Sequence, residues 1–354
     1  MSKLTQWLGS LEDETRSPYI IAEIGVNHNG NADSVIELIH MAKAAGADCV
    51  KFQVFKSELV ASPMAQTADY QSAATSNSSQ LDMLRKLELA ESSLLLARKV
   101  ADDVSLDFMA TAFDSASLQF VDSLDPVAHK IPSGEITNFD FLDKVRSLNR
   151  HIVLSTGMST IEEVRGAAQI LAGPSGSTVL HCVSAYPTQA RDANLLSIPF
   201  MRDRIGLHVG WSDHTVGNCT ALLALALGAR IFEKHVTMNT QQTGPDHSAS
   251  ADPEAFHDYV ASIRESHRAL GSLGKGIASV ELKTRSLVRR SWFATKNLQK
   301  GHVLRGDDVI ALRPVIGIQA DEIVVGHELS VDVVSGQPLK IETLKGFDEL
   351  KLRA

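Results

Sequence analysis

The chain has 354 residues, of which 44% are hydrophobic, and it carries a formal net charge of −8. No run of Lys and Arg is dense enough to follow a phosphate backbone, so the composition argues against a nucleic-acid partner and favours a small-molecule substrate. The length exceeds the ~250 residues typical of a single barrel, which predicts one large domain and a smaller second one.

The three cysteines, Cys49, Cys182 and Cys219, are far apart in sequence and lie in apolar stretches that are typical of a core. A disulfide framework is therefore not expected, and a cytoplasmic location is favoured. The acidic N-terminal segment has no apolar run of signal-peptide length, and no later stretch approaches the ~18 apolar residues of a membrane span. We expect a soluble, unprocessed protein with no membrane partner.

From residue 19 onwards, short β-rich apolar runs alternate with amphipathic helical segments. This order predicts parallel strands joined by right-handed helical crossovers. The candidate strands are YIIAEIGV (19–26), DCVKFQVF (48–55), DFMATAF (107–113), AHKIPSG (128–134), HIVLSTG (151–157), TVLHCVS (178–184), HVGWSD (208–213) and RIFEKHVT (230–237). Eight such strands predict an α/β fold, a closed (β/α)8 TIM barrel, because open doubly wound sheets usually have fewer.

The segments between the strands fall into two kinds. Residues 32–47 and 91–104 have apolar side chains at three- and four-residue spacing, which predicts helices packed on the barrel. Residues 56–90 are instead long, polar and rich in Ser, Thr, Gln and Ala. A segment of that length after the second strand indicates an active-site loop or lid.

The alternation of strands and helices stops near residue 270, so the barrel domain is expected at 1–270. A Gly- and Lys-containing linker is expected at 271–286. Short strand-like runs separated by turns follow, and they predict a small second domain at 287–354. Residues 291–314 and 326–340 in this part resemble the antifreeze-like, or SAF, domain.

Polar or ionisable side chains stand at the C-terminal ends of nearly all the predicted strands, the face on which TIM barrels carry their active sites. In chain order they are Glu23, Lys51, Gln53, Thr111, Lys130, Ser133, Glu135, Ser155, Ser184, Tyr186, Ser212, His214, Glu233 and His235. A single Ser or Thr at such a place often caps a helix, and a single Lys often extends to solvent. The same feature on eight consecutive strands favours one convergent pocket.

Two of these residues, His214 and His235, lie on neighbouring predicted strands, where both imidazoles could reach one ion. Two neutral imidazoles with positions left for water and substrate oxygens suit a catalytic Mn, Co, Zn or Mg centre. A single barrel histidine is more often a hydrogen-bonded core residue, and spacing alone leaves the choice open. The competing histidines are His28, His129, His151, His181 and His247.

Several other residues of the predicted pocket suit a phosphate group. Lys51 and Lys130 supply positive charge, and hydroxyl donors come from Ser133, Ser155, Ser184 and Ser212. Glu23, Glu233 and Asp246 are then available to transfer protons. A phosphate cradle beside a metal indicates two substrates, or two ends of one, and favours a condensation over a hydrolysis.

From about residue 18 to 342 the sequence resembles the N-acetylneuraminate (sialic acid) synthase family, the NeuB-type enzymes that include legionaminic and pseudaminic acid synthases. The motifs that carry the resemblance are IAEIGVNHNG, VKFQVFKSELV, SQLDMLRKLEL, TAFD, KIPSGEITNFDFL, LSTGMST, LHCVSAYPT, GWSDHTVG, LGARIFEKHVT and GPDHSAS. None of these motifs would suffice alone, but together they are specific.

The resemblance implies a metal-dependent condensation of phosphoenolpyruvate with the open-chain aldehyde of an N-acylated mannose-type sugar. The products would be a nine-carbon 2-keto acid and phosphate. His214 and His235 would bind the divalent metal, for which Mn²⁺ is expected, with Mg²⁺, Co²⁺ or Zn²⁺ as alternatives. The physical logic is Lewis-acid activation at one end of the site and phosphate clamping at the other.

The same motifs imply roles for the other residues. The carboxylate side of phosphoenolpyruvate would be held by Lys51 and Thr111, and its phosphate by Lys130, Ser133, Ser155, Ser184 and Ser212. The sugar and the metal-bound water would be lined by Gln53, Glu135, Tyr186 and Asp246. Glu23 and Glu233 would steer protons and the attacking water, and the division of that work between them is open.

In the small domain, Arg313 matches a family arginine that reaches the N-acyl group of the sugar in the partner subunit's site. The match implies a domain-swapped homodimer. The chain departs from the family here, because relatives commonly read RP-x-N-G where this sequence has Arg313-Pro314-Val315-Ile316-Gly317. The missing Asn puts the local contact and the preferred N-acyl sugar in doubt.

Two other functions stay open. A Schiff-base aldolase would use Lys51, Lys130 or Lys234 with a depressed pKa and no metal, and it would leave the histidine pair unused. A non-enzymatic carbohydrate or ice-surface binder would depend on the antifreeze-like module, but the full set of polar strand-end residues argues against a decayed barrel. If the chain is a synthase, neither N-acetylmannosamine nor a 2,4-diacetamido sugar is excluded as its substrate.

Overall fold

The computed structural model describes residues 2–8, 16–68, 71–72, 75 and 79–347. The chain divides into two compact units, residues 1–272 and 273–354, and each is described by itself. None of the helices in the described ranges combines the length and the apolar character needed to cross a membrane.

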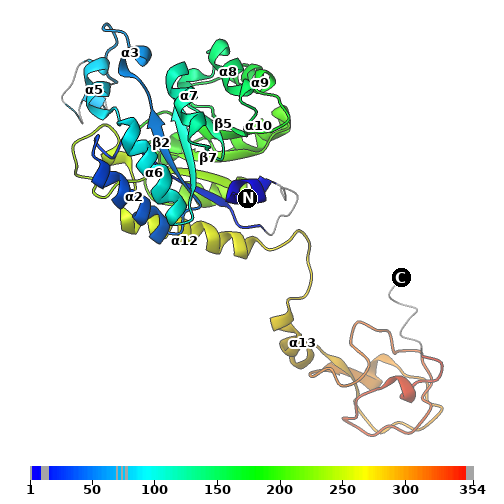
Figure 1. The fold of residues 1–354 in the computed structure, drawn as a ribbon. Helices are drawn as coiled ribbons and strands as arrows, with labels where there is room; N and C mark the ends of the chain where they lie inside the picture. The colour runs from blue at the N-terminus through cyan, green and yellow to red at the C-terminus, as the bar shows by residue number, and fades with distance from the viewer. Residues whose placement is uncertain (1, 9–15, 69–70, 73–74, 76–78, 348–354) are drawn as a thin grey trace. The chain divides into compact units, whose positions relative to one another are not determined.

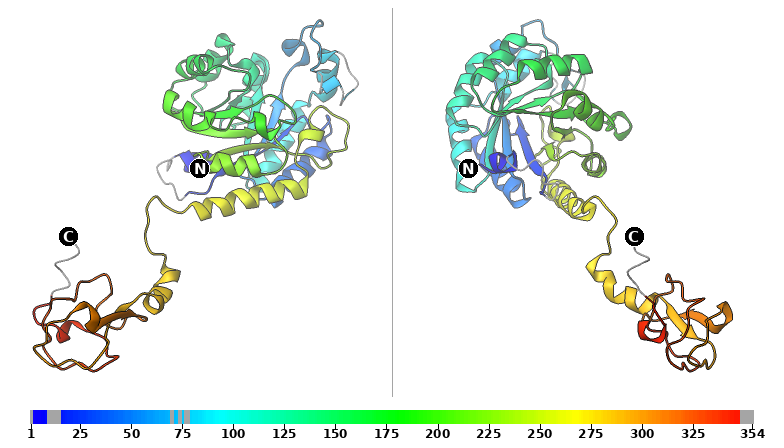
Figure 2. Two further views of the ribbon diagram at one scale, coloured as in Figure 1. Left: turned by 180° about the vertical axis from the view of Figure 1, so that it is seen from behind. Right: turned by 90° about the vertical axis from the view of Figure 1, so that its right-hand side faces the viewer.

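The first unit is a closed barrel of eight parallel strands in sequential order, because β8 pairs with β1 (Figures 1 and 2). The strands are β1 (Tyr19–Gly25), β2 (Cys49–Val54), β3 (Asp107–Ala112), β4 (His129–Ile131), β5 (Ile152–Ser155), β6 (Ser177–Cys182), β7 (Val209–Asp213) and β8 (Ile231–His235). The predicted TIM barrel is thereby confirmed. β4 is the shortest strand and is followed by Pro132, which lacks the N–H that a continued ladder requires.

Helices surround the strands (Figure 2). They are α2 (Ala32–Ala44), α6 (Glu91–Asp103), α7 (Ser115–Ser123), α8 (Phe139–Ser147), α9 (Ile161–Ile170), α10 (Ser197–Ile205), α11 (Cys219–Ala226) and α12 (Pro253–Leu270). Several begin with a side chain that satisfies free backbone N–H groups, as Asp252 does before Pro253 in α12. The segment expected as a loop at 56–90 is partly helical, and its described residues include the short helices α3 (Ser57–Val60) and α5 (Gln80–Leu87).

The inside of the barrel is layered. Its apolar layer is a buried cluster that includes Ile21, Cys49, Met109, Ala128, Val153, Leu180 and Ile231. Side chains along a strand alternate between its two faces, so residues two positions farther along point to the same interior. Those residues are Glu23, Lys51, Thr111, Lys130, Ser155, Cys182 and Glu233. The interior therefore changes from apolar to polar one layer closer to the C-terminal ends of the strands.

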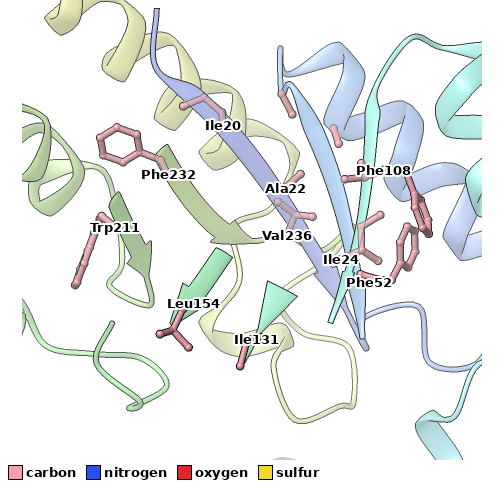
Figure 3. Close-up of a cluster of buried hydrophobic side chains, with 14 of the residues drawn as sticks. Ile20, Ala22, Ile24, Phe52, Phe108, Ile131, Leu154, Trp211, Phe232 and Val236 are labelled. Carbon is pink, nitrogen blue, oxygen red and sulfur yellow. The ribbon is translucent and has the colours of Figure 1, made fainter. Parts of the chain in front are cut away.

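The opposite faces of the strands hold a second apolar core, which packs against the helices (Figure 3). Ile20, Ala22 and Ile24 of β1 belong to it, together with Phe52 of β2 and Phe108 of β3. The two phenylalanine rings stack with centroids 5.7 Å apart. Apolar residues on this outer face and polar ones on the inner face explain why the strands read as nearly continuous apolar runs with isolated charges.

A short N-terminal helix that the sequence did not predict, α1 (Lys3–Leu8), contacts the base of the barrel. Leu4 and Trp7 are buried in the same cluster as the apolar interior layer. The Asp107 carboxylate, at the start of β3, accepts hydrogen bonds from the Leu4 backbone N–H (2.7 Å) and the Tyr19 hydroxyl (2.8 Å). The N-terminal end of the barrel is thus covered by apolar side chains.

The second unit has its own small core, which includes Leu298, Leu304, Leu329 and Leu339. It contains the antiparallel pair β9 (Ser291–Ala294) and β10 (Val309–Leu312). The segment expected as a linker, 271–286, holds one turn of 3-10 helix at Ser279–Glu281 and the start of α13 (Leu282–Val288).

Gly210 of β7 lies next to the apolar interior layer, where a methyl group has no room. A Cβ atom there would collide with the Ile231 carbonyl oxygen and lie 2.7 Å from a methyl carbon of Leu180. We expect Gly210→Ala to lower the free energy of unfolding by ~1–3 kcal/mol, as overpacking does. Urea denaturation followed by circular dichroism measures the change.

Gly166→Ala is the matched control, because Gly166 lies within α9 and nothing occupies the space around its Cβ position. In a helix, alanine should raise the free energy of unfolding by ~0.5–1 kcal/mol. A Gly210→Ala protein as stable as the parent would contradict the packing described for the barrel interior.

Candidate active site

A cavity of about 550 Å³ opens above the polar layer, at the C-terminal ends of the strands. Its lining includes the predicted residues Glu23, Lys51, Gln53, Thr111, Lys130, Ser133, Ser155, Ser184, Tyr186, Ser212, His214, Glu233, His235 and Asp246. These side chains come from all eight strands or the loops after them. The structure therefore brings together what the sequence placed at separate strand ends.

Two predicted residues are not part of this lining. Glu135 lies in the 3-10 turn after β4, where its carboxylate accepts a hydrogen bond from Asn138 at 2.7 Å. Arg313 belongs to the second unit, where it is exposed directly after β10.

Lys51 is the centre of the polar layer. Its ammonium lies 2.7 Å from Glu23 Oε2 and 3.5 Å from Glu233 Oε2, and it donates a hydrogen bond to Thr111 Oγ1 at 3.1 Å. The Lys51 side chain is 3% exposed, and those of Glu23 and Glu233 are 1% and 5% exposed. Charges that are so deeply buried are tolerated only when each has a partner.

Lys130 forms the second half of the layer. Its ammonium donates to Ser155 Oγ at 2.6 Å and lies 3.5 Å from Glu233 Oε1. The same carboxylate oxygen accepts a hydrogen bond from Ser212 at 2.9 Å. Glu233 thus sits between both lysines and couples β2, β4 and β7 through one carboxylate.

The two buried glutamates have opposite protonation tendencies. Burial alone would raise the pKa of Glu233, but Lys130 and Lys51 outweigh it and lower that pKa to about 2. Burial raises the pKa of Glu23 by more than Lys51 lowers it, and the negative Glu233 raises it further. Neighbouring carboxyls whose environments separate their pKa values are suited to different roles, with Glu233 the one that stays ionised and Glu23 the one that more readily takes up a proton.

A small hydroxyl-lined hollow lies beside the lysines. The Gly157 backbone N–H donates to Ser133 Oγ at 2.8 Å. A Cβ atom at Gly157 would lie 2.9 Å from that oxygen and would collide with Ser184 Oγ. Glycine at this position therefore lets two hydroxyls and a backbone N–H lie close together, and these are groups that bind phosphate oxygens.

The histidine pair stands on the other side of the cavity. The imidazoles of His214 and His235 have centroids 5.4 Å apart, and the ring of Tyr186 lies 4.1 Å from the first and 5.8 Å from the second. His214 Nδ1 is 2.8 Å from the Val183 carbonyl oxygen, which fixes its ring orientation. His235 Nδ1 is buried without a hydrogen-bond partner, and Asp246 Oδ2 lies 3.9 Å away.

These residues fit a divalent cation bound through two imidazoles. Burial, His214 and Lys51 hold the pKa of His235 well below its usual value, so His235 is neutral and available as a ligand. Burial would also lower the pKa of His214, but Cys182 and the Val183 carbonyl outweigh it and raise that pKa, so a cation there would compete with protonation. Among the described residues no three His, Cys, Asp or Glu side chains converge on one point, so water and substrate would complete the ligand set.

The competing histidines have structural partners and do not line the cavity. Those partners are the Gly30 N–H for His28, Asp122 for His129, Ser175 and Thr178 for His151, the Ala193 carbonyl for His181, and Thr237 for His247. Spacing did not separate these residues from the pair in the sequence, whereas their position relative to the cavity does.

Several parts of the cavity lining were not predicted from the sequence, among them Cys182 and residues of α5. Cys182, assigned there to the core, lines the cavity, and its Sγ lies 3.9 Å from His214 Nδ1. Its position midway between Leu180 and Ser184, on one face of the strand, was the signal that could have revealed it. The apolar residues Met83, Leu84 and Leu87 of α5 also line the cavity, inside the segment expected to border the site.

Comparison with known proteins gives consistent matches. A model of the NeuB family matches residues 38–275, and a model of the SAF domain matches residues 289–345. The N,N'-diacetyllegionaminic acid synthase of Legionella pneumophila is 41% identical over 92% of this chain and 94% of its own. The enzyme of the same name from Campylobacter jejuni is 40% identical over 85% of this chain and 92% of its own.

Among solved structures, the N-acetylneuraminic acid (sialic acid) synthetase of Leptospira borgpetersenii superimposes with a TM-score of 0.68. It is 28% identical and covers 76% of this chain and 90% of its own.

The imidazole pair predicts that the purified protein binds Mn²⁺ directly. His235→Ala should weaken that binding by more than the ~10–100-fold that loss of a supporting residue costs, because a ligand itself is removed. Electron paramagnetic resonance of free Mn²⁺ measures the affinity without any substrate. His151→Gln is the control, because His151 precedes β5 at the opposite end of the barrel. Equal affinities of parent and His235→Ala proteins would contradict the assignment.

Proposed function

Because the chain belongs to the NeuB family, we propose that it condenses phosphoenolpyruvate with the open-chain aldehyde of an N-acylated mannose-type sugar. Its family and the SAF domain confirm the resemblance noted in the sequence. The observation that carries the proposal is the two-sided cavity, with buried lysines and hydroxyls on one side and the imidazole pair on the other. Such a site holds two reactants at once, which removes much of the entropic cost of a bimolecular step.

Phosphoenolpyruvate suits the lysine side. Its carboxylate would lie near Lys51 and Thr111, and its phosphate would occupy the hollow of Ser133, Gly157 and Ser184, with Lys130, Ser155 and Ser212 nearby. Clamping by charge-assisted hydrogen bonds then fixes its C3 carbon towards the imidazoles.

The proposed reaction forms one carbon–carbon bond and one carbon–oxygen bond to water, and it breaks the carbon–oxygen bond to phosphate. C3 of phosphoenolpyruvate attacks the sugar aldehyde carbon, whose oxygen gains a proton. Water adds to the resulting cation at C2, and the tetrahedral intermediate expels phosphate to leave the 2-keto acid. A divalent ion at His214 and His235, with Mn²⁺ favoured, would supply Lewis-acid polarisation of the aldehyde.

Glu233 and Glu23 divide the remaining work. The ionised Glu233 faces the region in which positive charge develops at C2, and it stabilises that charge electrostatically. Glu23, whose raised pKa makes it a better proton acceptor, takes the proton of the attacking water. Gln53 donates to Glu23 Oε1 at 3.1 Å and orients the carboxylate for this transfer.

We propose further that the far end of the sugar is uncharged. Among the described residues that line the cavity, the positively charged lysine and arginine side chains are those of Lys51 and Lys130. Both belong to the buried polar layer. The rim is lined by Gln66, Gln71 and Gln80, with Met83 beside them. The 41% and 40% identical relatives are N,N'-diacetyllegionaminic acid synthases, so a 2,4-diacetamido sugar is favoured over N-acetylmannosamine or a pseudaminic precursor.

The setting of the enzyme is part of the proposal. We infer a domain-swapped homodimer in which Arg313 of one subunit reaches the N-acyl group bound in the other. We also infer a cytoplasmic location, because three unpaired cysteines, Cys49, Cys182 and Cys219, suit a reducing compartment.

The substrate panel tests the proposal. Phosphate release from phosphoenolpyruvate with Mn²⁺ should be fastest with the 2,4-diacetamido sugar of the legionaminic route and slower with N-acetylmannosamine and the pseudaminic precursor. N-acetylmannosamine 6-phosphate should be the poorest substrate, because the described rim residues of the subunit that binds it offer its phosphate no cation. Mass spectrometry identifies each product.

Two controls accompany the panel. Chelation should abolish phosphate release and Mn²⁺ should restore it, whereas borohydride with substrate should leave the protein unlabelled, in contrast to a Schiff-base aldolase. If phosphoenolpyruvate released no phosphate with any sugar of the panel, the synthase proposal would be wrong. A binding role based on the SAF domain would then be the remaining hypothesis.

Arg313→Ala tests the contact between subunits. Loss of a charged hydrogen bond should raise the KM of the sugar by ~10-fold or more and leave the KM of phosphoenolpyruvate nearly unchanged. Mixing Arg313→Ala with His235→Ala subunits should restore part of the activity, because one site of the mixed dimer would be intact. An equal rise in both KM values would argue against the contact.

A further inference from the structure

A buried ion pair lies on the outer face of the barrel, directly behind the imidazole pair. The Lys234 ammonium is 3.4 Å from Asp213 Oδ2, and the side chains are 3% and 0% exposed. Neither residue lines the active-site cavity, and the proposed reaction uses neither of them. The pair therefore needs an explanation outside the chemistry described above.

The pair occupies the positions next to both histidines. Asp213 precedes His214 at the end of β7, and Lys234 precedes His235 at the end of β8, and the two residues are register partners across these neighbouring strands. Because strand side chains alternate, the histidines point inwards where the ion pair points outwards. A contact between residues 213 and 234 therefore fixes the backbone from which both imidazoles extend.

Further contacts tie Lys234 to both sides of His214. Besides Asp213, its ammonium donates to the backbone carbonyl of Thr215, the residue after His214. Asp213 Oδ1 in turn accepts from the Thr215 N–H at 2.8 Å and from its hydroxyl at 2.7 Å. One ammonium thus holds the residues before and after one imidazole while it stands next to the other.

On the side that faces the helices, residues of α11 and α12 enclose the ammonium of Lys234 and its partners. The ammonium lies 5.2 Å from the ring centroid of Tyr259, a fully buried residue of α12. Thr220 of α11 contacts the Thr215 hydroxyl at 2.5 Å. The ion pair is therefore confined between the strands and two helices, and its geometry has little freedom.

Stability alone does not account for such an arrangement. A buried ion pair costs desolvation that its attraction barely repays, and well-packed apolar residues are often as stable. What the pair provides is a defined distance between two strand ends. An open two-imidazole site depends on such supporting contacts for the orientation of its ligands.

We propose that Lys234 and Asp213 are positioning residues that set the separation of His214 and His235 for metal binding. The inference rests on the proposed function, because it takes the two histidines as the metal ligands. Contacts on the outer face of the barrel would then set the geometry of the metal site inside it.

The test measures Mn²⁺ affinity by electron paramagnetic resonance, without substrate, in the full-length protein. Lys234→Met should lower the affinity at least tenfold and should also lower the melting temperature, because it leaves Asp213 as an unpaired buried charge. The double variant Asp213→Asn with Lys234→Met removes that charge, so its melting temperature should recover most of the loss. Its Mn²⁺ affinity should stay low, because the tie to the Thr215 carbonyl is still missing.

Arg264→Met is the matched control. Arg264 of α12 binds Asp48 at 3.0 Å and the Gly46 carbonyl at 2.9 Å, a similar set of partners, but at the start of β2, at the opposite end of the barrel. Its loss should lower the melting temperature and leave the Mn²⁺ affinity within twofold of the parent.

The outcomes separate the inference from the proposed function. A parent protein that binds no Mn²⁺ would refute the metal site and the inference with it. A parent that binds Mn²⁺, with a Lys234→Met variant of equal affinity, would overturn the inference and leave the proposed function intact. Recovery of affinity together with stability in the double variant would also overturn it, because the effect would then be one of folding.

Discussion

Ionised side chains inside a protein persist only where each faces a partner, and in this barrel that requirement organises the site. Two lysines and two glutamates occupy one interior layer, and Lys51 and Lys130 share the carboxylate of Glu233. The layer beneath them is apolar, so these charged side chains cannot be solvated by water from that side. The charged side chains and their partners are consequently held at fixed distances, so the electrostatic field in the cavity above them is preorganised.

The unequal number of close contacts gives the two glutamates different characters. Glu233 meets both lysines and Ser212, whereas Glu23 meets Lys51 and Gln53. The carboxylate with more cationic neighbours is the harder one to protonate. The difference between the pKa values of Glu233 and Glu23 thus follows from the partners around each side chain.

Much of the fold and most of the site could be predicted from the sequence. Strand periodicity, with the C-terminal face of a barrel as the place of function, was enough to bring together residues as distant as Glu23 and His235. The failures have local causes. α1 is too short to show a periodic pattern, and its position depends on tertiary hydrogen bonds to Asp107. Cys182 was taken for core because a thiol is apolar enough to be ambiguous, and Glu135 lies in a 3-10 turn, where strand alternation no longer applies.

The covered base of the barrel limits how substrates enter the site and how products leave it. Leu4 and Trp7 of α1 pack under an apolar layer, so molecules exchange through the C-terminal face. For the proposed reaction, the groups that would bind phosphoenolpyruvate lie deeper than the glutamine-lined rim. The deeper substrate would then enter before the sugar. For the proposed reaction, a closed base would thereby impose a compulsory order on the two substrates.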